Sequence, residues 1–241
     1  MREKAGLDRP VVLIDLDNTI LDFSAAERVA LTRALTDQGL PADEAMLRRY
    51  HEINIRHWEM LEDGLLTREE VLVKRFEALF RERGVEADAF RTQEMYESNL
   101  AEGHWFVPGA EELLEALYGQ YRLFICSNGT GSVQDGRIAS AGLAPYFEDI
   151  FISERIGGNK PERGFFEACF ARIPGFRRER AIILGDSLTS DIRGGINAGI
   201  LTCWFNPRGK ENPGAIRPDR EIRSLEQFPP LLERVFGDGE G

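Results

Sequence analysis

The chain has 241 residues, of which 42% are hydrophobic and 29% are charged, a composition typical of a folded globular protein. Its 41 acidic and 30 basic residues give a formal net charge of −11, which disfavours binding to nucleic acid polymers or to an anionic membrane surface. No stretch approaches the ~20 apolar residues that span a bilayer, and the first ten residues lack the apolar core of a signal peptide. The few cysteines fit buried thiols and lack zinc-site spacing. We therefore expect a cytoplasmic protein.

The first element is an aliphatic strand, "VVLID", that leads directly into two carboxylates, Asp15 and Asp17. Further aliphatic runs of strand length follow after residue 105, and helical segments separate them. Alternation of strands and helices predicts an α/β protein with a parallel sheet that has helices on both faces. The expected strands are 11–15, 121–128, 148–153, 180–186 and 199–205, and a last helix is expected within 224–236.

Residues 24–104 interrupt this alternation, because they contain helical patterns and no convincing strand. Glycines punctuate the patterns, as helix C-termini often require, and Thr67 with Glu70 fits a capping box. We therefore expect an inserted helical domain at 24–104 and an α/β core formed by 1–23 and 105–241. The expected helices of the insertion lie within 24–40, 42–61, 67–84 and 87–103.

Polar side chains follow the expected core strands, and in open parallel sheets ligands bind beyond the carboxyl ends of the strands. If the strands are parallel, these side chains converge on one crevice. They are Asp15, Asp17 and Thr19 after the first strand, Ser127, Asn128, Gly129 and Thr130 after the second, Lys160 after the third, and Asp186, Ser187 and Asp191 after the fourth. For each of these residues, the alternative to a role in a ligand site is that it caps a strand–helix turn or lies in an ordinary surface loop.

These residue types suit phosphoryl transfer. One carboxylate can attack phosphorus and form an aspartyl-phosphate, while a second, brought to the leaving group by a turn, can act as general acid. Clustered acids bind Mg²⁺, which relieves their mutual repulsion and neutralises phosphate. A lysine and a hydroxyl can hold the transferring group, where positioning and charge stabilisation supply most of the catalysis.

The motifs "DLDNT", "SNG", "NKP" and "GDSLTSD" resemble, in order, the four motifs of the haloacid dehalogenase (HAD) superfamily. The resemblance implies a Rossmann-like core, a helical cap of the first type at the insertion, and Mg²⁺ as cofactor. It implies that Asp15 is the nucleophile and that Asp17 is the general acid/base, whose backbone carbonyl also binds the metal. It further implies that Ser127, Asn128 and Lys160 bind the phosphate. The implied metal site consists of Asp15, Asp17, Asp186 and Asp191. Asp191 would orient the metal waters or the lysine.

A narrower resemblance, carried by 52–80 and 190–207, is to pyrimidine 5′-nucleotidases of the house-cleaning kind. It implies a small-molecule phosphate ester, a nucleoside monophosphate, as substrate. The alternatives are a phosphatase for another small ester such as phosphoglycolate or a sugar phosphate, a 2-haloacid dehalogenase, against which Asp17 argues, and a non-catalytic binding member. The base, the sugar and the choice between monomer and homodimer stay open.

Within the insertion, Asn54 and Trp58 lie four residues apart on one expected helix and are candidates for substrate specificity. Together with Ile55 and Leu61 they also trace one helical face, so packing inside the insertion is the alternative. The segment "GGINAG" lacks the spacing of a dinucleotide-binding loop, and we expect a helix C-terminus there with Gly199 as its cap.

Overall fold

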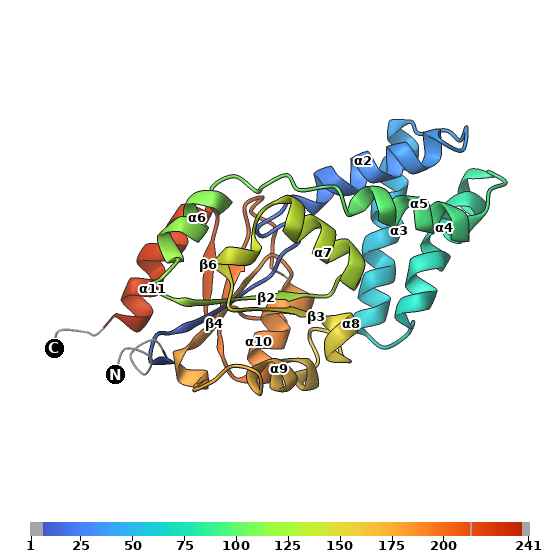
Figure 1. The fold of residues 1–241 in the computed structure, drawn as a ribbon. Coiled ribbons are helices and arrows are strands. Elements are labelled where there is room, and N and C mark those ends of the chain that lie inside the picture. Colours follow the sequence, from blue (N-terminus) through green and yellow to red (C-terminus); the bar gives the residue numbers. More distant parts are fainter. Residues whose placement is uncertain (1–6, 213, 238–241) are drawn as a thin grey trace. The chain divides into compact units, whose positions relative to one another are not determined.

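The computed structural model describes residues 7–212 and 214–237 (Figure 1). The expectation about a signal sequence therefore falls partly on residues outside the described part. The chain divides into an α/β unit, formed by Met1–Asp22, Phe106–Gly131 and Gly142–Gly241, and a helical unit, formed by Phe23–Trp105 and Ser132–Ala141. None of the helices in the described ranges combines the length and the apolar character that a bilayer crossing requires.

A six-stranded sheet in the order β3-β2-β1-β4-β5-β6, with every neighbouring pair parallel, forms the centre of the α/β unit. The predicted fold class is confirmed. The short edge strand β6 was not predicted, because two of its three residues are exposed and it carries no aliphatic run. The strands are β1 (Val11–Ile14), β2 (Arg122–Ser127), β3 (Asp149–Ile152), β4 (Ala181–Gly185), β5 (Leu201–Phe205) and β6 (Arg220–Ile222).

Helices cover both faces of this sheet (Figure 1). One face packs on α9 and α10 through a buried cluster that includes Leu13, Phe124, Phe166 and Ile183, and α6 and α11 lie on the other face. Gly199 ends α10 in the left-handed conformation, as expected. The helices and short helical turns of this unit are α6 (Ala110–Leu117), η1 (Ala144–Tyr146), α8 (Ser153–Ile156), α9 (Arg163–Phe170), η2 (Arg178–Arg180), η3 (Leu188–Ile192), α10 (Arg193–Ala198), η4 (Leu225–Gln227) and α11 (Phe228–Phe236).

The helical unit consists of α2 (Phe23–Thr36), α3 (Glu44–Glu62), α4 (Arg68–Arg83), α5 (Ala89–Leu100) and nearly all of α7 (Gly131–Ser140). Its core is one buried apolar cluster with contributions from all five helices. The capping box of Thr67 and Glu70 starts α4 as expected, and Gly84 ends that helix in the left-handed conformation.

A chain of buried polar side chains also joins four of these helices. Gln93 accepts a hydrogen bond from Arg75 (2.6 Å), Arg75 donates to Asn54 (2.7 Å), and Asn54 donates to Glu27 (2.6 Å). The second oxygen of Glu27 pairs with the ring of His51. Because a buried polar group costs free energy unless it is hydrogen-bonded, this chain fixes the four helices in one arrangement.

The boundaries of the helical unit differ from the expected insertion at 24–104. They lie one residue further out at each end, and the unit also includes 132–141, which were expected in the core.

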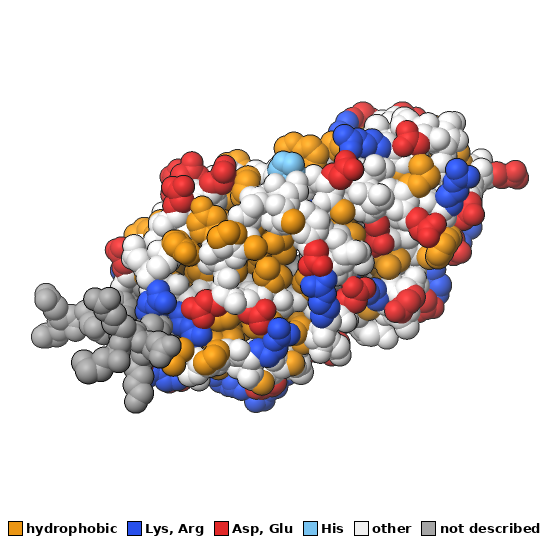
Figure 2. All heavy atoms as spheres, viewed as in Figure 1, with side chains coloured by type: hydrophobic (Ala, Val, Ile, Leu, Met, Phe, Trp, Pro, Cys, Tyr) orange, Lys and Arg blue, Asp and Glu red, His pale blue; other side chains and the backbone are white. Residues whose placement is uncertain are grey.

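On the face that Figure 2 shows, acidic and basic side chains of the described residues are interspersed, without a continuous basic stripe.

Candidate active site

The site begins at a tight turn that follows β1. The amide of Asp15 continues the ladder to β4 by donating to Leu184 O (2.9 Å), and the chain then folds back so that the amides of Ile20 and Leu21 both donate to Leu16 O. Asn18 sits in this turn with φ 59°, a left-handed conformation that Asn tolerates better than most residues. The turn keeps Asp15 and Asp17 at the carboxyl end of the central strand.

Lys160 is buried with 1% of its surface exposed, and three oxygen atoms surround its ammonium group. Its Nζ donates to Asp15 Oδ1 at 2.6 Å, to Asp191 Oδ1 at 2.7 Å and to the backbone oxygen of Cys126 at 2.7 Å. An ammonium group has three donors, so every donor of this lysine is used. The lysine therefore links the ends of β1 and β2 with the turn that follows β4.

Asp186 and Asp191 reach the same place from the segment after β4. The indole of Trp204 holds the backbone of Asp186 in place, because its nitrogen donates to the Asp186 carbonyl at 2.9 Å. Asp191 lies in η3, a single turn of π-helix, a form that often marks functional sites. Its second oxygen accepts from the amide of Ser187 at 3.1 Å. Carboxylate oxygens of Asp15, Asp186 and Asp191 all lie within 4.8 Å of one another.

Burial and mutual repulsion perturb the acids of this cluster. Burial raises the pKa of Asp15 well above its usual value, Lys160 opposes this, and the neighbouring acids add to it. Burial, with repulsion from Asp191, raises the pKa of Asp186 to about 7. The pKa of Lys160 is raised because Asp15 and Asp191 outweigh the effect of its burial. The cluster thus holds more negative charge than one lysine can compensate.

The predicted phosphate holders Ser127 and Asn128 follow β2 beside this cluster. Ser127 is buried, and its Oγ accepts from the amide of Gly129 at 3.2 Å. Asn128 points its side chain at the backbone of Lys160, to which it makes two hydrogen bonds of 2.8 and 2.9 Å. The contacts of Asn128 therefore serve the lysine-bearing loop, and a direct contact with phosphate stays a prediction.

The two specificity candidates lie in the helical unit, and their surroundings differ. Asn54 is buried, and both atoms of its amide are engaged within the unit, by Glu27 and by Arg75. This geometry corresponds to the packing alternative for Asn54. Trp58 is partly exposed, and the guanidinium of Arg68 lies 5.5 Å from the centre of its ring, so one face of the indole is covered.

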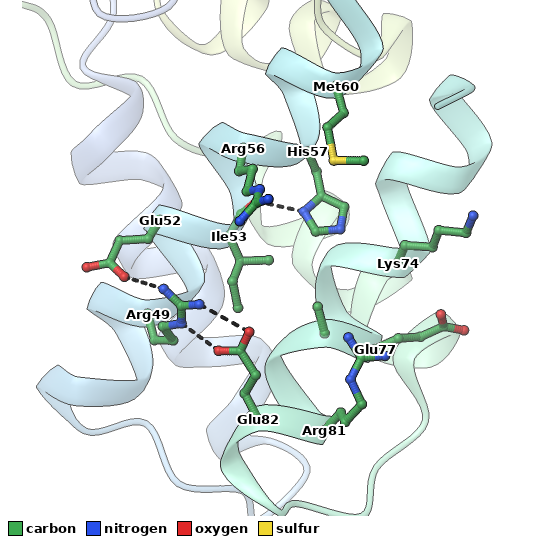
Figure 3. Close-up of a pocket in the computed structure, with 11 residues that line it drawn as sticks. Arg49, Glu52, Ile53, Arg56, His57, Met60, Lys74, Glu77, Arg81 and Glu82 are labelled. Atoms are coloured by element: carbon green, nitrogen blue, oxygen red, sulfur yellow. Dashed lines mark hydrogen bonds and ion pairs between the residues drawn. The ribbon is translucent and has the colours of Figure 1, made fainter. Parts of the chain in front are cut away.

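A cavity of about 430 Å³ lies between α3 and α4 of the helical unit (Figure 3). Arg49 crosses one end of it and binds both Glu52 and Glu82, while His57 bonds to the carbonyl of Ile53. Basic and acidic side chains of both helices line the cavity together. None of the predicted site residues lines it, and its mixed charge does not match a single class of ligand.

The chemistry of the donor set fits a hard divalent cation. Three carboxylates from two neighbouring strand ends converge, one with a pKa raised to about 7, and the nearby ammonium is already shared between two of them. Oxygen ligands of this kind are those that Mg²⁺ prefers. Both oxygens of Asp191 are occupied by Lys160 and by the Ser187 amide, which suits a residue that orients the lysine.

Four supporting contacts of the site were not assigned from the sequence. The hydroxyl of Thr19 donates to Asp15 Oδ2 (3.3 Å), the carbonyl of Cys126 accepts from Lys160, the Ser187 amide binds Asp191, and the indole of Trp204 holds Asp186. Thr19 and Ser187 follow predicted strands, so their places in the sequence could have indicated that they belong to the site. Trp204 and Cys126 lie within strands, and their sequence pattern shows only that they are buried.

Comparison with known proteins agrees with this geometry. A model of the haloacid dehalogenase-like hydrolases matches residues 10–199. The chain is 44% identical over 221 residues to the HAD-hydrolase YfnB from Bacillus subtilis, covering 92% of this chain and 94% of that protein. A crystal structure of YfnB bound to magnesium superposes with a TM-score of 0.89 over 93% of this chain and 98% of that one.

Two pyrimidine 5′-nucleotidases are also similar along almost their whole length. PynA from Streptococcus pneumoniae is 39% identical and covers 92% of this chain and 94% of its own. YjjG from Escherichia coli is 31% identical and covers 92% and 96%. The resemblance that the four motifs indicated is therefore confirmed, and the chain belongs to the haloacid dehalogenase-like hydrolase family.

Proposed function

We propose that this protein is a Mg²⁺-dependent phosphohydrolase that acts through an aspartyl-phosphate on Asp15, with a pyrimidine-type nucleoside 5′-monophosphate as substrate. The observation that carries the proposal is the buried lysine between Asp15 and Asp191 beside a third carboxylate, Asp186. The charge of a lysine fixed in this way would neutralise an oxyanion at the strand ends, and the neighbouring carboxylates would attract a cation there. The pyrimidine nucleotide is supported by the similarity to PynA and YjjG.

In the proposed reaction, an oxygen of Asp15 attacks phosphorus, the ester P–O bond breaks, and Asp17 gives its proton to the leaving oxygen. Water then attacks the phosphorus of the aspartyl-phosphate while Asp17 takes up the proton, which releases inorganic phosphate and restores the Asp15 carboxylate. The positive charge of Lys160 balances the charge of the transferring group, and the hydroxyl of Ser127 binds one of its oxygens.

A bound Mg²⁺ would be held by Asp15, Asp186 and the backbone carbonyl of Asp17, and it would neutralise charge on the phosphate. Asp191 would act by orienting Lys160. We propose that the helical unit supplies the contacts that distinguish one phosphate ester from another, since the proposed roles of Asp15, Lys160 and Asp186 involve only the phosphoryl group.

A phosphatase for another small ester remains the second candidate. The contacts of Asn54 favour it, because an amide that is already shared by Glu27 and Arg75 is not available to a base edge. Trp58 is then the remaining aromatic candidate for recognising a nucleotide.

The test is phosphate release from a panel of pyrimidine and purine nucleotides, phosphoglycolate, sugar phosphates and an aryl phosphate, with Mg²⁺ and with EDTA. We expect pyrimidine nucleotides to be the best substrates, activity to vanish in EDTA, and Mg²⁺ to restore it better than Ca²⁺, whose longer and more numerous bonds loosen the octahedral geometry. Asp15→Asn is the control for contaminating phosphatases, and it should lose about a thousandfold or more of the activity. Full activity in EDTA or in Asp15→Asn would refute the mechanism.

A further inference from the structure

Helix α7 belongs to both units of the molecule. Its first residue, Gly131, is part of the α/β unit, whereas residues 132–140 belong to the helical unit. The helix follows directly on Ser127–Thr130, the loop that carries the predicted phosphate holder. Any displacement of the helix is therefore passed on to this loop through the covalent chain.

The start of α7 is fixed within the α/β unit. The amide of Gly131 donates to Glu154 Oε2 at 2.7 Å, and the guanidinium of Arg155 lies beside Gly131. A side chain at position 131 would collide with the Glu154 carboxylate, since a Cβ atom there would come within 2.7 Å of it.

The rest of α7 is fixed within the helical unit, and Arg137 is the main contact. Its side chain is fully buried, and its Nε donates to the carbonyl of Gly103 at 3.0 Å. A second guanidinium nitrogen donates to Gln134 at 3.1 Å, and the group lies 5.6 Å from the ring of Phe23. A buried guanidinium is costly unless its hydrogen bonds are made, so this contact strongly favours one position of the helix.

The backbone of α7 also approaches the helical unit closely. A Cβ atom at Gly136 would lie 2.8 Å from the carbonyl oxygen of Ala101, so only glycine allows the observed distance. Val133, one turn earlier, is part of the apolar core of the helical unit. Helix α7 thus has three independent attachments to this unit, at Val133, Gly136 and Arg137.

We propose that Arg137 is a positioning residue that acts through α7: by fixing the helix to the helical unit, it sets the position of the Ser127–Thr130 loop and hence the affinity of the site for the phosphoryl group. Arg137 lies roughly 9 Å along the helix axis from Gly131, at about 1.5 Å per residue, and α7 is continuous between the two residues. The inference rests on the proposed function only in so far as the loop binds phosphate.

The test compares Arg137→Met with Arg75→Met. Both residues are almost completely buried arginines of the helical unit, but Arg75 makes its hydrogen bonds away from α7. For each variant we would measure the melting temperature, kcat and KM for an aryl phosphate, and the inhibition constant of inorganic phosphate. Hydrogen–deuterium exchange at the amides of 127–131 would be measured on the same samples.

We expect Arg137→Met to raise KM and the phosphate inhibition constant about fivefold or more, as for a typical coupling between sites, with a smaller change in kcat. Exchange at 127–131 should rise as well. Arg75→Met should lower the melting temperature without these changes. Arg137→Lys, which keeps a donor for Gly103, should recover part of the phosphate affinity.

Gly136→Ala perturbs the same helix by a different route and should act in the same direction as Arg137→Met. Gly164→Ala, on α9 where a Cβ atom meets open space, is its control. Equal effects of Arg137→Met and Arg75→Met on phosphate affinity, together with unchanged exchange at 127–131, would overturn the proposal. If the wild-type protein hydrolyses no ester, the proposed function fails, while the exchange comparison still decides whether Arg137 positions the loop.

Discussion

The side chain of Asn128 holds the backbone of Lys160 at two points. Its Oδ1 accepts from the Lys160 amide at 2.8 Å, and its Nδ2 donates to the Lys160 carbonyl at 2.9 Å. The loop after β3 is thereby attached to the loop after β2. We expect the position of the Lys160 ammonium group between Asp15 and Asp191 to depend on this attachment.

Asn128→Ala should therefore lower the activity while leaving Asp15, Asp17 and Lys160 themselves in place. Misplacement of a catalytic group by about 1 Å can cost on the order of a hundredfold, so we expect kcat/KM for an aryl phosphate to fall by roughly ten- to a hundredfold. Asn197→Ala is the matched control, because Asn197 makes a single bond to the carbonyl of the adjacent Pro161 (3.0 Å). Equal losses in both variants would show that the attachment of Lys160 by Asn128 has no special effect.

Stability of the metal-free protein should depend on pH through Asp15 and Asp186. Both pKa values are raised in the folded state, that of Asp186 to about 7, whereas an unfolded Asp titrates near ~3.9. Between these values the folded state binds more protons than the unfolded state, so stability falls as the pH rises through this window. In EDTA, we expect a lower melting temperature at about pH 8 than at about pH 5.5.

Mg²⁺ should reverse this trend, because it binds the ionised carboxylates of the folded state and stabilises that state by mass action. The gain in melting temperature on adding Mg²⁺ should therefore be larger at the higher pH. Asp186→Asn should flatten the pH dependence in EDTA and remove most of the gain. A gain that is independent of pH and survives in Asp186→Asn would place the metal elsewhere.

Asp17→Asn should affect substrates according to their leaving groups. A proton donor matters most when the leaving oxygen is basic, as in a nucleotide or a sugar phosphate, and least for an aryl phosphate. We expect a substantially larger loss of kcat for the nucleotide than for the aryl ester. If the two losses are the same, Asp17 serves the metal site or the turn after β1 and not proton transfer.

Trp58→Ala tests whether the helical unit recognises a base. Base–aromatic stacking is worth ~1–3 kcal/mol, so loss of the indole should raise KM for a pyrimidine nucleotide roughly tenfold while leaving an aryl phosphate nearly unaffected. Arg68→Ala removes only the guanidinium that covers one face of the Trp58 ring. Comparison of the two variants separates the effect of base stacking from the effect of losing the Arg68–Trp58 contact. A fall in melting temperature with equal penalties on both substrates would instead make Trp58 a packing residue.

The α/β core could be predicted because each of its central strands is a buried aliphatic run, and the acids and Lys160 could be located because they follow these runs. The contacts among them could not, since Asp191 reaches Lys160 only through the π-turn of η3. The surroundings of Asn54 could not be predicted for the same reason. Its partners Glu27 and Arg75 come from other helices, and the pattern of its own helix does not indicate them. Strand β6 is too short and too exposed to have a pattern of its own.

The attachment of α7 to the helical unit has a consequence for recombining this protein with its relatives. An exchange of the continuous segment 23–105 alone would bring a foreign helical unit against the native α7, leaving Arg137 and Gly136 opposite residues that did not evolve with them. A chimera that also carries 132–141 from the same donor keeps these contacts together. A chimera designed to exchange the helical unit should therefore receive both segments from one donor as a set.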